Sequence, residues 1–226
     1  MILAAGFFSC TKEEVPKIPA TYASFKVGGN DTVIADNFSA IEISVQLDTS
    51  SSKDQKAVSF TTTIGSFIEG GTTVTVNSDI GGVANVHFKS NTIGNATLKA
   101  SITGNSTNLV ISKDVYCSAA WPDLITINTS ATLSHGLGNK LQVSANCLRN
   151  FGTVSQNIQV QFYATDTLNH GKGAFYNISP TDQAGKANSE FWLQDTTFSG
   201  YLYIYSKVVT NKNQTILGKT QVFVTK

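Results

Sequence analysis

The side chains that most often carry catalysis or bind metal ions are few in this chain and far apart in its sequence. Its three histidines, His87, His135 and His170, show neither the His-x-x-x-His spacing nor the neighbouring cysteines that metal sites use. No Gly-x-Ser-x-Gly nucleophile motif occurs, and the carboxylates gather in segments that are typical of turns. We therefore expect no catalytic residue, no metal and no cofactor.

Asn30-Asp31 and Asp36-Asn37 are the side chains that could best offer oxygen ligands to Ca²⁺. Calcium loops space several acidic residues at regular intervals within one loop, and neither pair belongs to such a loop. Asn and Asp also hydrogen-bond to nearby backbone N–H groups and thereby stabilise turns. We favour this turn-forming role for both pairs.

Cys117 and Cys147 allow two outcomes. Both follow residue 113, where we place the start of a second domain, and they lie near its first two strands. In an oxidising compartment they could form a disulfide, which would add roughly 3 to 4 kcal/mol by constraining the unfolded chain. They could instead be two buried free thiols. We favour the disulfide, although a sequence does not show whether the Cα atoms come within bonding range.

The run Tyr201-Leu202-Tyr203-Ile204-Tyr205 is the strongest candidate for a binding surface. In a strand, alternate residues point to the same face, so the three tyrosines share one face and the aliphatic pair the other. Tyrosine is enriched at recognition surfaces. The alternative is that the aromatic rings stiffen the sheet or cover a junction between domains. The candidate surface comprises Tyr201, Tyr203, Tyr205, Trp121 and Trp192, with Tyr163 and Tyr176 expected nearby.

The first nine residues form an apolar run that ends at Cys10 and is too short to cross a bilayer as a mature helix. It has the length of the apolar part of a signal peptide but lacks a basic start, so we expect a longer signal to begin upstream of Met1. Phe7-Phe8-Ser9-Cys10 resembles the lipobox of bacterial lipoproteins. That resemblance implies cleavage before Cys10 and acylation of its thiol and amine, which gives a stable membrane anchor. The alternative is a buried N-terminal strand with an incidental cysteine.

The segment after Cys10 is polar, contains two of the four prolines and shows no periodicity, so we interpret residues 10–21 as a lipidated cysteine and tether. Lys12-Glu13-Glu14 resembles the export signal of surface lipoproteins in Bacteroidota, which implies exposure on the cell surface. Three triplets, in which Asp-Thr is followed by an aliphatic residue or a second threonine, resemble the O-glycosylation site of envelope proteins from the same bacteria. The threonines implied by this resemblance are Thr32, Thr167 and Thr196.

From about Tyr22 onward, short alternating segments are separated by clusters of Gly, Asn, Ser or Asp, a spacing that predicts a sandwich of antiparallel strands. Ile41–Leu47 and Val83–Phe88 both alternate apolar and polar residues, which gives each a core face and a water face. His87 falls on the polar phase of its segment. No segment carries a helical period.

The chain also repeats itself. An Asp-x-x-Gly-x-Ala-Asn heptad at Asp79–Asn85 returns at Asp182–Asn188, and each copy is preceded by Val-x-Phe and Gly-x-Phe. The heptad predicts a tight turn in which the carboxylate accepts backbone N–H groups and the glycine adopts positive φ, directly before a strand. We therefore predict two tandem domains, at residues 22–113 and 114–226.

This order of motifs, ending in Gly94-Asn95-Ala96-Thr97-Leu98, resembles the bacterial immunoglobulin-like domains of the invasin and intimin type. The first domain matches over most of its length, and the second mainly through Thr181–Ala187. The resemblance implies an all-β fold of two tandem antiparallel immunoglobulin-like β-sandwiches. Such domains serve as spacers on bacterial surfaces, so the resemblance implies little about a ligand.

Composition limits the possible partners. The chain has 226 residues, a formal net charge of +1 and a single arginine, Arg149, so it lacks the basic field that nucleic acids require. Its 27 Thr, 23 Ser and 18 Asn suit strands and turns. We predict a non-catalytic lipoprotein of the outer membrane, displayed at the cell surface as a spacer or protein-interaction module. The alternative is an accessory lipoprotein that binds polysaccharide through the aromatic face of the second domain.

Overall fold

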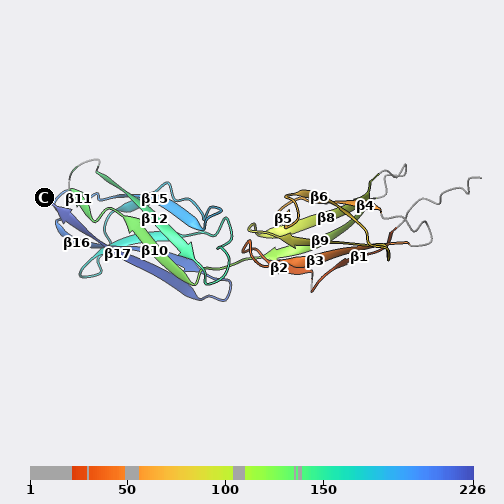
Figure 1. Cartoon of the computed structure of the whole chain (residues 1–226). Coiled ribbons are helices and arrows are strands. Elements are labelled where there is room, and N and C mark those ends of the chain that lie inside the picture. Colours follow the sequence, from red (N-terminus) through yellow and green to blue (C-terminus); the bar gives the residue numbers. More distant parts are fainter. Residues whose placement is uncertain (1–21, 30, 49–55, 104–109, 135, 137–138) are drawn as a thin grey trace, which may run out of the picture.

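The computed structural model describes residues 22–29, 31–48, 56–103, 110–134, 136 and 139–226. These residues form seventeen strands and two sandwiches joined end to end (Figure 1). No described helix is long and apolar enough to span a membrane. The fold confirms the prediction of two tandem antiparallel β-sandwiches.

The first sandwich packs a four-stranded sheet, in the order β1-β3-β7-β5, against a five-stranded sheet, in the order β2-β9-β8-β4-β6. All neighbours are antiparallel except β2 and β9, which are parallel. Its strands are β1 (Tyr22–Val27), β2 (Thr32–Ile34), β3 (Ile41–Leu47), β4 (Ala57–Thr62), β5 (Ser66–Phe67), β6 (Thr73–Asn77), β7 (Val83–Lys89), β8 (Gly94–Ile102) and β9 (Val110–Ser118).

The second sandwich repeats this topology, with sheets ordered β10-β12-β15-β14 and β11-β17-β16-β13. The parallel pair recurs as β11 and β17. The repeat seen in the sequence is therefore a repeat of strand order, with β6 as the additional strand of the first copy. The strands are β10 (Leu124–Thr129), β11 (Thr132–Ser134), β12 (Lys140–Leu148), β13 (Gln161–Asp166), β14 (Ala174–Tyr176), β15 (Lys186–Trp192), β16 (Gly200–Val209) and β17 (Thr215–Thr225).

Each sandwich has its own core, built by the inward phase of its strands. Phe60 and Phe88 are fully buried in the first core, and Phe191 is fully buried in the second. Burying an aromatic side chain of this size contributes about 1.5 to 3 kcal/mol. Because β9 pairs with β8 as far as Cys117, the first sandwich extends beyond residue 113, where we expected it to end.

The two Asp-x-x-Gly turns have the geometry that the heptad predicts. Asp79 Oδ1 accepts a hydrogen bond from the N–H of Val83 at 2.8 Å, and Asp182 Oδ1 accepts one from the N–H of Lys186 at 2.9 Å. The third residue after each aspartate is a glycine with positive φ, 80° in the first turn and 74° in the second. A residue with a Cβ is strained in this conformation, which explains the glycine.

The sandwiches meet at a buried, hydrogen-bonded junction between β2, the linker after β9 and the loop after β12. Ser155 of the second sandwich is fully buried there. Its hydroxyl donates to the carbonyl of Ala35 in the first sandwich at 2.7 Å and accepts from the N–H of Ala120 in the linker at 2.8 Å. One side chain therefore ties both sandwiches and the linker together.

Asp36 and Arg149 form the charged part of the same junction. The Asp36 carboxylate accepts the N–H of Phe38 and of Ser39, and it lies 3.8 Å from the guanidinium of Arg149. Arg149 also donates to the carbonyl of Trp121 at 3.1 Å. Asp36 therefore has the turn-forming role that we favoured over calcium binding. Asn30 lies outside the described residues.

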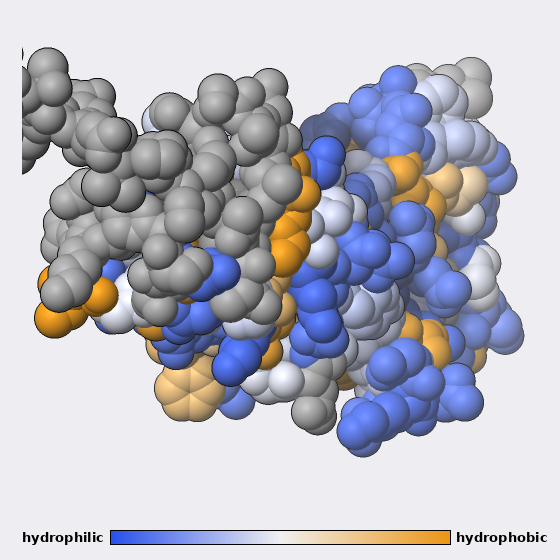
Figure 2. Space-filling model, turned by 90° about the vertical axis from the view of Figure 1, so that its right-hand side faces the viewer, coloured by the Kyte–Doolittle hydropathy of each residue, from blue (hydrophilic) through white to orange (hydrophobic). Residues whose placement is uncertain are grey.

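The described surface is mostly hydrophilic when the molecule is viewed along its long axis from the first sandwich (Figure 2). Hydrophobic residues gather there in a few separate patches. A surface of this kind is ordinary for a soluble domain, so a larger exposed apolar or aromatic area elsewhere needs a separate explanation.

Candidate functional site

The tyrosines of β16 lie on the outer surface of the second sandwich, as the alternation predicts. Leu202 and Ile204 are fully buried in the core, while Tyr201 is half exposed and Tyr203 and Tyr205 are partly exposed. Flanking strands add Tyr163 of β13 and Phe223 of β17, 40% and 41% exposed. We define the tyrosine face as the outward positions of β13, β16 and β17. Its aromatic residues are Tyr163, Tyr201, Tyr203, Tyr205 and Phe223.

Cross-strand contacts hold these rings in place. Tyr163 lies opposite Tyr205 in the register and stacks on it, with ring centroids 4.7 Å apart and planes inclined by 6°. Tyr201 lies opposite Phe223, with centroids 5.0 Å apart and an edge-to-face inclination of 65°. Such pairs stabilise a sheet by about 0.5 to 1.5 kcal/mol beyond area burial. The sheet-stiffening role considered for these tyrosines is thus physically present.

The charge of the tyrosine face is positive. Lys219 places its Nζ 3.8 Å from the ring centroid of Tyr203 and 5.4 Å from that of Tyr205. Lys207 lies opposite Leu217 on the same face. The remaining outward positions of β13, β16 and β17 are neutral, so this part of the described surface carries two ammonium groups and no carboxylate.

Trp192 does not join the tyrosine face, so our expectation that it lies nearby is wrong. It points outward from β15, in the other sheet of the sandwich, beside Tyr176 with ring centroids 5.0 Å apart. The Nζ of Lys140 lies 4.3 Å from the Trp192 ring centroid. The same Nζ forms an ion pair with Oε2 of Glu190 at 3.3 Å. The sequence shows which residues alternate along a strand but not which of two sheets the strand enters.

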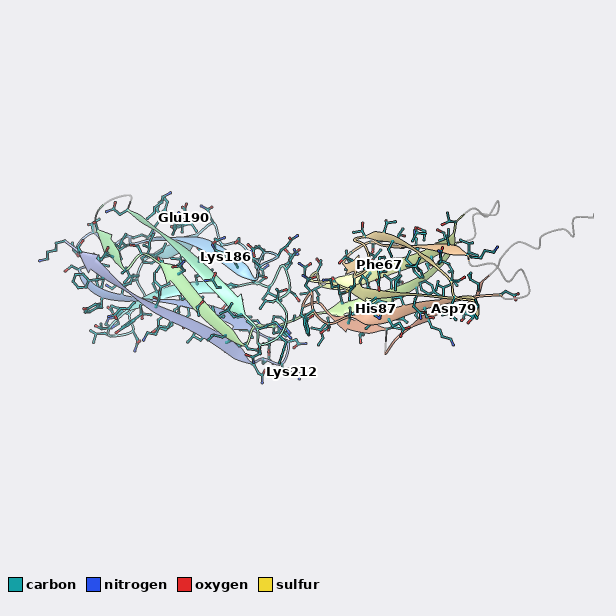
Figure 3. The ribbon with its side chains drawn as sticks, in the orientation of Figure 1. Phe67, Asp79, His87, Lys186, Glu190 and Lys212 are labelled. Carbon is teal, nitrogen blue, oxygen red and sulfur yellow. The ribbon has the colours of Figure 1, made fainter. Side chains whose placement is uncertain are left out.

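Trp121 lies at the junction between the sandwiches rather than among the tyrosines. It borders a surface groove of about 560 Å³ together with Ile34 and Tyr116 of the first sandwich. On the other side, the groove is bordered by Asn211 and Lys212, from the hairpin that joins β16 to β17. Figure 3 shows Lys212 at the end of the second sandwich beside the first. Trp121 therefore has the junction role that we considered for the aromatic residues.

The expected disulfide between Cys117 and Cys147 is wrong. Both thiols are free and buried; Cys117 belongs to the core of the first sandwich and Cys147 to that of the second. Burial raises the pKa of Cys147 to about 11 and also raises the pKa of Cys117. The error came from assigning the end of β9 to the second domain. The alternative of two buried thiols is what the structure describes.

The three threonines of the Asp-Thr triplets, Thr32, Thr167 and Thr196, are all exposed. Two of the triplets meet, because Lys172 lies 4.0 Å from Asp166 and 3.5 Å from Asp195. Desolvation raises the pKa of Asp166, but N–H groups of the following loop and the neighbouring His170 outweigh it and lower the pKa overall. These contacts are those of loop structure, and modification of the threonines stays a prediction.

The other candidate residues are either isolated or undescribed. His87 is exposed, as expected, and its ring contacts Glu69 at 2.7 Å. Cys10 and His135 lie outside the described residues. Among those described, no three His, Cys, Asp or Glu side chains are arranged to hold a metal ion.

The sequence reasoning missed Lys219, Phe223 and the groove. The first two could have been found, because Lys219-Thr220-Gln221-Val222-Phe223 alternates as β16 does. The groove had no signal in the sequence, since its lining comes from separate segments of both sandwiches, such as those of Ile34 and Lys212.

No model of a protein family and no curated protein matches the sequence. Among solved structures, the chain is similar to invasin, a bacterial integrin-binding protein, with 18% identity and a TM-score of 0.58 over 92% of this chain and 39% of that one. It also matches the D0-D1 domain of intimin, with 17% identity and a TM-score of 0.35 over 89% and 98% of the chains. This chain thus spans about two fifths of the invasin structure. At such identity, the likeness to invasin establishes the fold alone.

Proposed function

We propose that this chain is a non-catalytic lipoprotein of the outer membrane, anchored through Cys10 and displayed on the surface of a bacterium of the Bacteroidota. Its two sandwiches act as a spacer and as an interaction module for another envelope protein. The observation that carries the proposal is the junction, where the Ser155 hydroxyl bonds to both the first sandwich and the linker. A spacer needs such a junction, because a flexible one would let the outer sandwich fold back toward the membrane.

A protein partner is supported by analogy. Invasin, which has a similar fold, is a bacterial integrin-binding protein. The partner of this chain would differ, because immunoglobulin-like sandwiches bind through loops and edges that vary independently of the fold. Crosslinking on intact cells, followed by identification of what copurifies, tests this part. Recovery of the chain without any crosslinked envelope protein would contradict it.

The anchor is tested by Cys10→Ala. We expect this variant to leave the membrane fraction and to lose labelling by a fatty-acid analogue, since it lacks the acylated thiol. Cys147→Ala is the matched control, because it removes a buried thiol and leaves the lipobox intact. Protease treatment of intact cells then tests display, with cleavage expected only if the chain faces outward. Membrane association that persists in Cys10→Ala would overturn the anchor.

Polysaccharide binding is the second candidate function. The observation that favours it is the tyrosine face, where five aromatic side chains lie at outward positions of one sheet and Tyr163 stacks on Tyr205. Replacing Tyr201, Tyr203 and Tyr205 with Ser should abolish retention on immobilised polysaccharide. Unchanged retention, or no retention of the unmodified chain, would exclude this candidate.

A further inference from the structure

The four described sheets end in edge strands, and most of these edges are protected against pairing with another chain. β2, β5, β11 and β14 have three residues or fewer. β1 carries Lys26 and an irregular register, and β10 packs against β17 of the facing sheet. Native proteins blunt their sheet edges by such means, because an open edge offers unpaired N–H and C=O groups to other strands.

In the second sandwich the edge of β13 is covered by the chain itself. The loop after β13 turns back along the edge, and the N–H of Asp166 donates to the carbonyl of His170 at 3.0 Å. The N–H of Lys172 likewise donates to the carbonyl of Ala164 at 2.9 Å. In the first sandwich the equivalent strand, β4, is covered by β6 instead. β6 thereby becomes the edge, and no described strand pairs with its other side.

The backbone groups on the open side of β6 belong to Thr73, Thr75 and Asn77. On the covered side, the carbonyl of Thr72 and the N–H of Ser78 form hydrogen bonds beside β4, at 3.1 and 2.8 Å. Bonded positions alternate along an antiparallel pair, so the even-numbered residues of β6 face β4 and the odd-numbered ones face away. Each odd-numbered residue therefore directs one donor and one acceptor outward.

The side chains of β6 do not guard this edge. Residues 70–78 include neither a charged residue nor a proline, and β6 keeps a regular register with β4. The odd-numbered side chains are exposed, while Val74 and Val76 are partly buried against the first core. A strand added to β6 would continue both surfaces of the sheet if its apolar residues lay beside these valines and its polar residues beside the threonines.

We propose that β6 receives an extended, uncharged segment of a partner protein, which adds to the sheet as an antiparallel strand. The row of outward N–H and C=O groups selects this occupant, because another extended backbone matches it group for group. The alternation along β6 requires the segment to alternate apolar and polar residues. The inference rests on the proposed protein-interaction function, and it adds the surface used and the form of the partner.

A second copy of this chain is the other strand that β6 could pair with. β6 runs along the length of the first sandwich (Figure 1), so antiparallel pairing would point two copies in opposite directions. Their N-terminal ends would then lie at opposite ends of the pair. Two chains anchored in one membrane through Cys10 would not meet in this way, so we assign the edge to a different protein.

The test uses a fluorescent peptide with the sequence of residues 72–78, capped at both ends, and the full chain carrying Cys10→Ala. This peptide is uncharged, and in antiparallel pairing with β6 it sets valine beside valine. Fluorescence anisotropy should show saturable binding. N-methylation of the peptide at the position of Thr75 should abolish binding, because it removes an N–H that faces β6. N-methylation at the position of Val74 is the matched control and should leave binding intact, because that N–H points away.

Variants of the protein test the same edge from the other side. Thr75→Pro removes an outward N–H without removing a hydrogen bond to β4, so we expect it to fold and to bind the peptide roughly tenfold more weakly or less. Thr75→Val keeps the N–H and the branched side chain and should bind normally. Thermal unfolding checks that both variants fold. The methylated peptides need no variant, so they decide the question even if Thr75→Pro is unstable.

The outcomes separate this inference from the function on which it rests. No binding of the peptide, or equal binding of both methylated forms, would overturn strand addition. Dimerisation of the Cys10→Ala chain that Thr75→Pro abolishes would assign the edge to a second copy and overturn the partner protein. In crosslinking on intact cells, an envelope protein recovered equally with and without Thr75→Pro would overturn β6 as the site and leave the interaction function standing. Recovery of no envelope protein would contradict the interaction function itself.

Discussion

Cys117 and Cys147 are protected by the two cores in which they lie. Each thiol is at most 2% exposed, and burial disfavours the charged thiolate because the surroundings solvate it poorly. The thiolate is the reactive form in disulfide exchange and alkylation. A raised pKa and a closed core thus act in the same direction, and both thiols should behave as small apolar groups.

We predict that these thiols do not react in the folded protein. With Cys10→Ser to remove the third cysteine, an aromatic disulfide reagent at pH 8 should release no coloured thiol in buffer and two equivalents in denaturant. The time course of absorbance measures both values. Rapid release of either equivalent under native conditions would mean that one core opens readily.

The Cys147 pKa also predicts how stability depends on pH. The thiol has an ordinary pKa of 9.0 when unfolded and one of about 11 when folded. Between these values the unfolded chain loses its proton more readily, so the contribution of this group to the free energy of unfolding is complete below pH 9 and falls as the pH approaches 11. Urea unfolding at several pH values should show a shallower decline in Cys147→Ala. Identical slopes would exclude the thiol as a cause.

At the scale of elements, the repeated turn before β15 depends on Gly185. Its φ is +74°, and a Cβ there would lie 2.7 Å from the carbonyl oxygen of Cys147, a backbone atom that cannot give way easily. Gly171 lies in another loop, has no such φ and would place a Cβ in open space. The two glycines therefore form a matched pair for substitution.

We predict that Gly185→Ala lowers the free energy of unfolding by about 1 to 3 kcal/mol, since it combines an unfavourable φ with a backbone clash. Gly171→Ala should be neutral or slightly stabilising. Urea denaturation followed by tryptophan fluorescence measures the difference. Equal stability of the two variants would show that the turn relaxes at little cost.

Alternation and turn chemistry made the elements predictable, and their limits explain the errors. The turns at Asp79 and Asp182 followed from local residue types, because the carboxylate and the glycine act within one turn. The outward tyrosines followed from a period of two. The position of Trp192 could not be predicted in this way, because it depends on which sheet β15 enters. The separation of Cys117 from Cys147 could not be predicted either, because it depends on where the first sandwich ends.

At the scale of the whole molecule, function depends on how the two sandwiches are held. Ser155 is central because its hydroxyl hydrogen-bonds the carbonyl of Ala35 in the first sandwich and the N–H of Ala120 in the linker. Asp36 and Arg149 add a charged contact across the same boundary. The proposed spacer needs this geometry, and so does the groove at the junction, which is lined by both sandwiches.

We predict that Ser155→Ala loosens the junction without unfolding either sandwich. It leaves a buried donor and a buried acceptor without their partner, at a cost of about 1 to 3 kcal/mol, and this cost is relieved if the sandwiches separate and water enters. Small-angle X-ray scattering should therefore show a wider distribution of distances than in the unmodified chain. Ser112→Ala, which changes an exposed serine on β9, should scatter like the unmodified chain. If Ser155→Ala does so too, the remaining contacts of the junction suffice to hold the sandwiches in line.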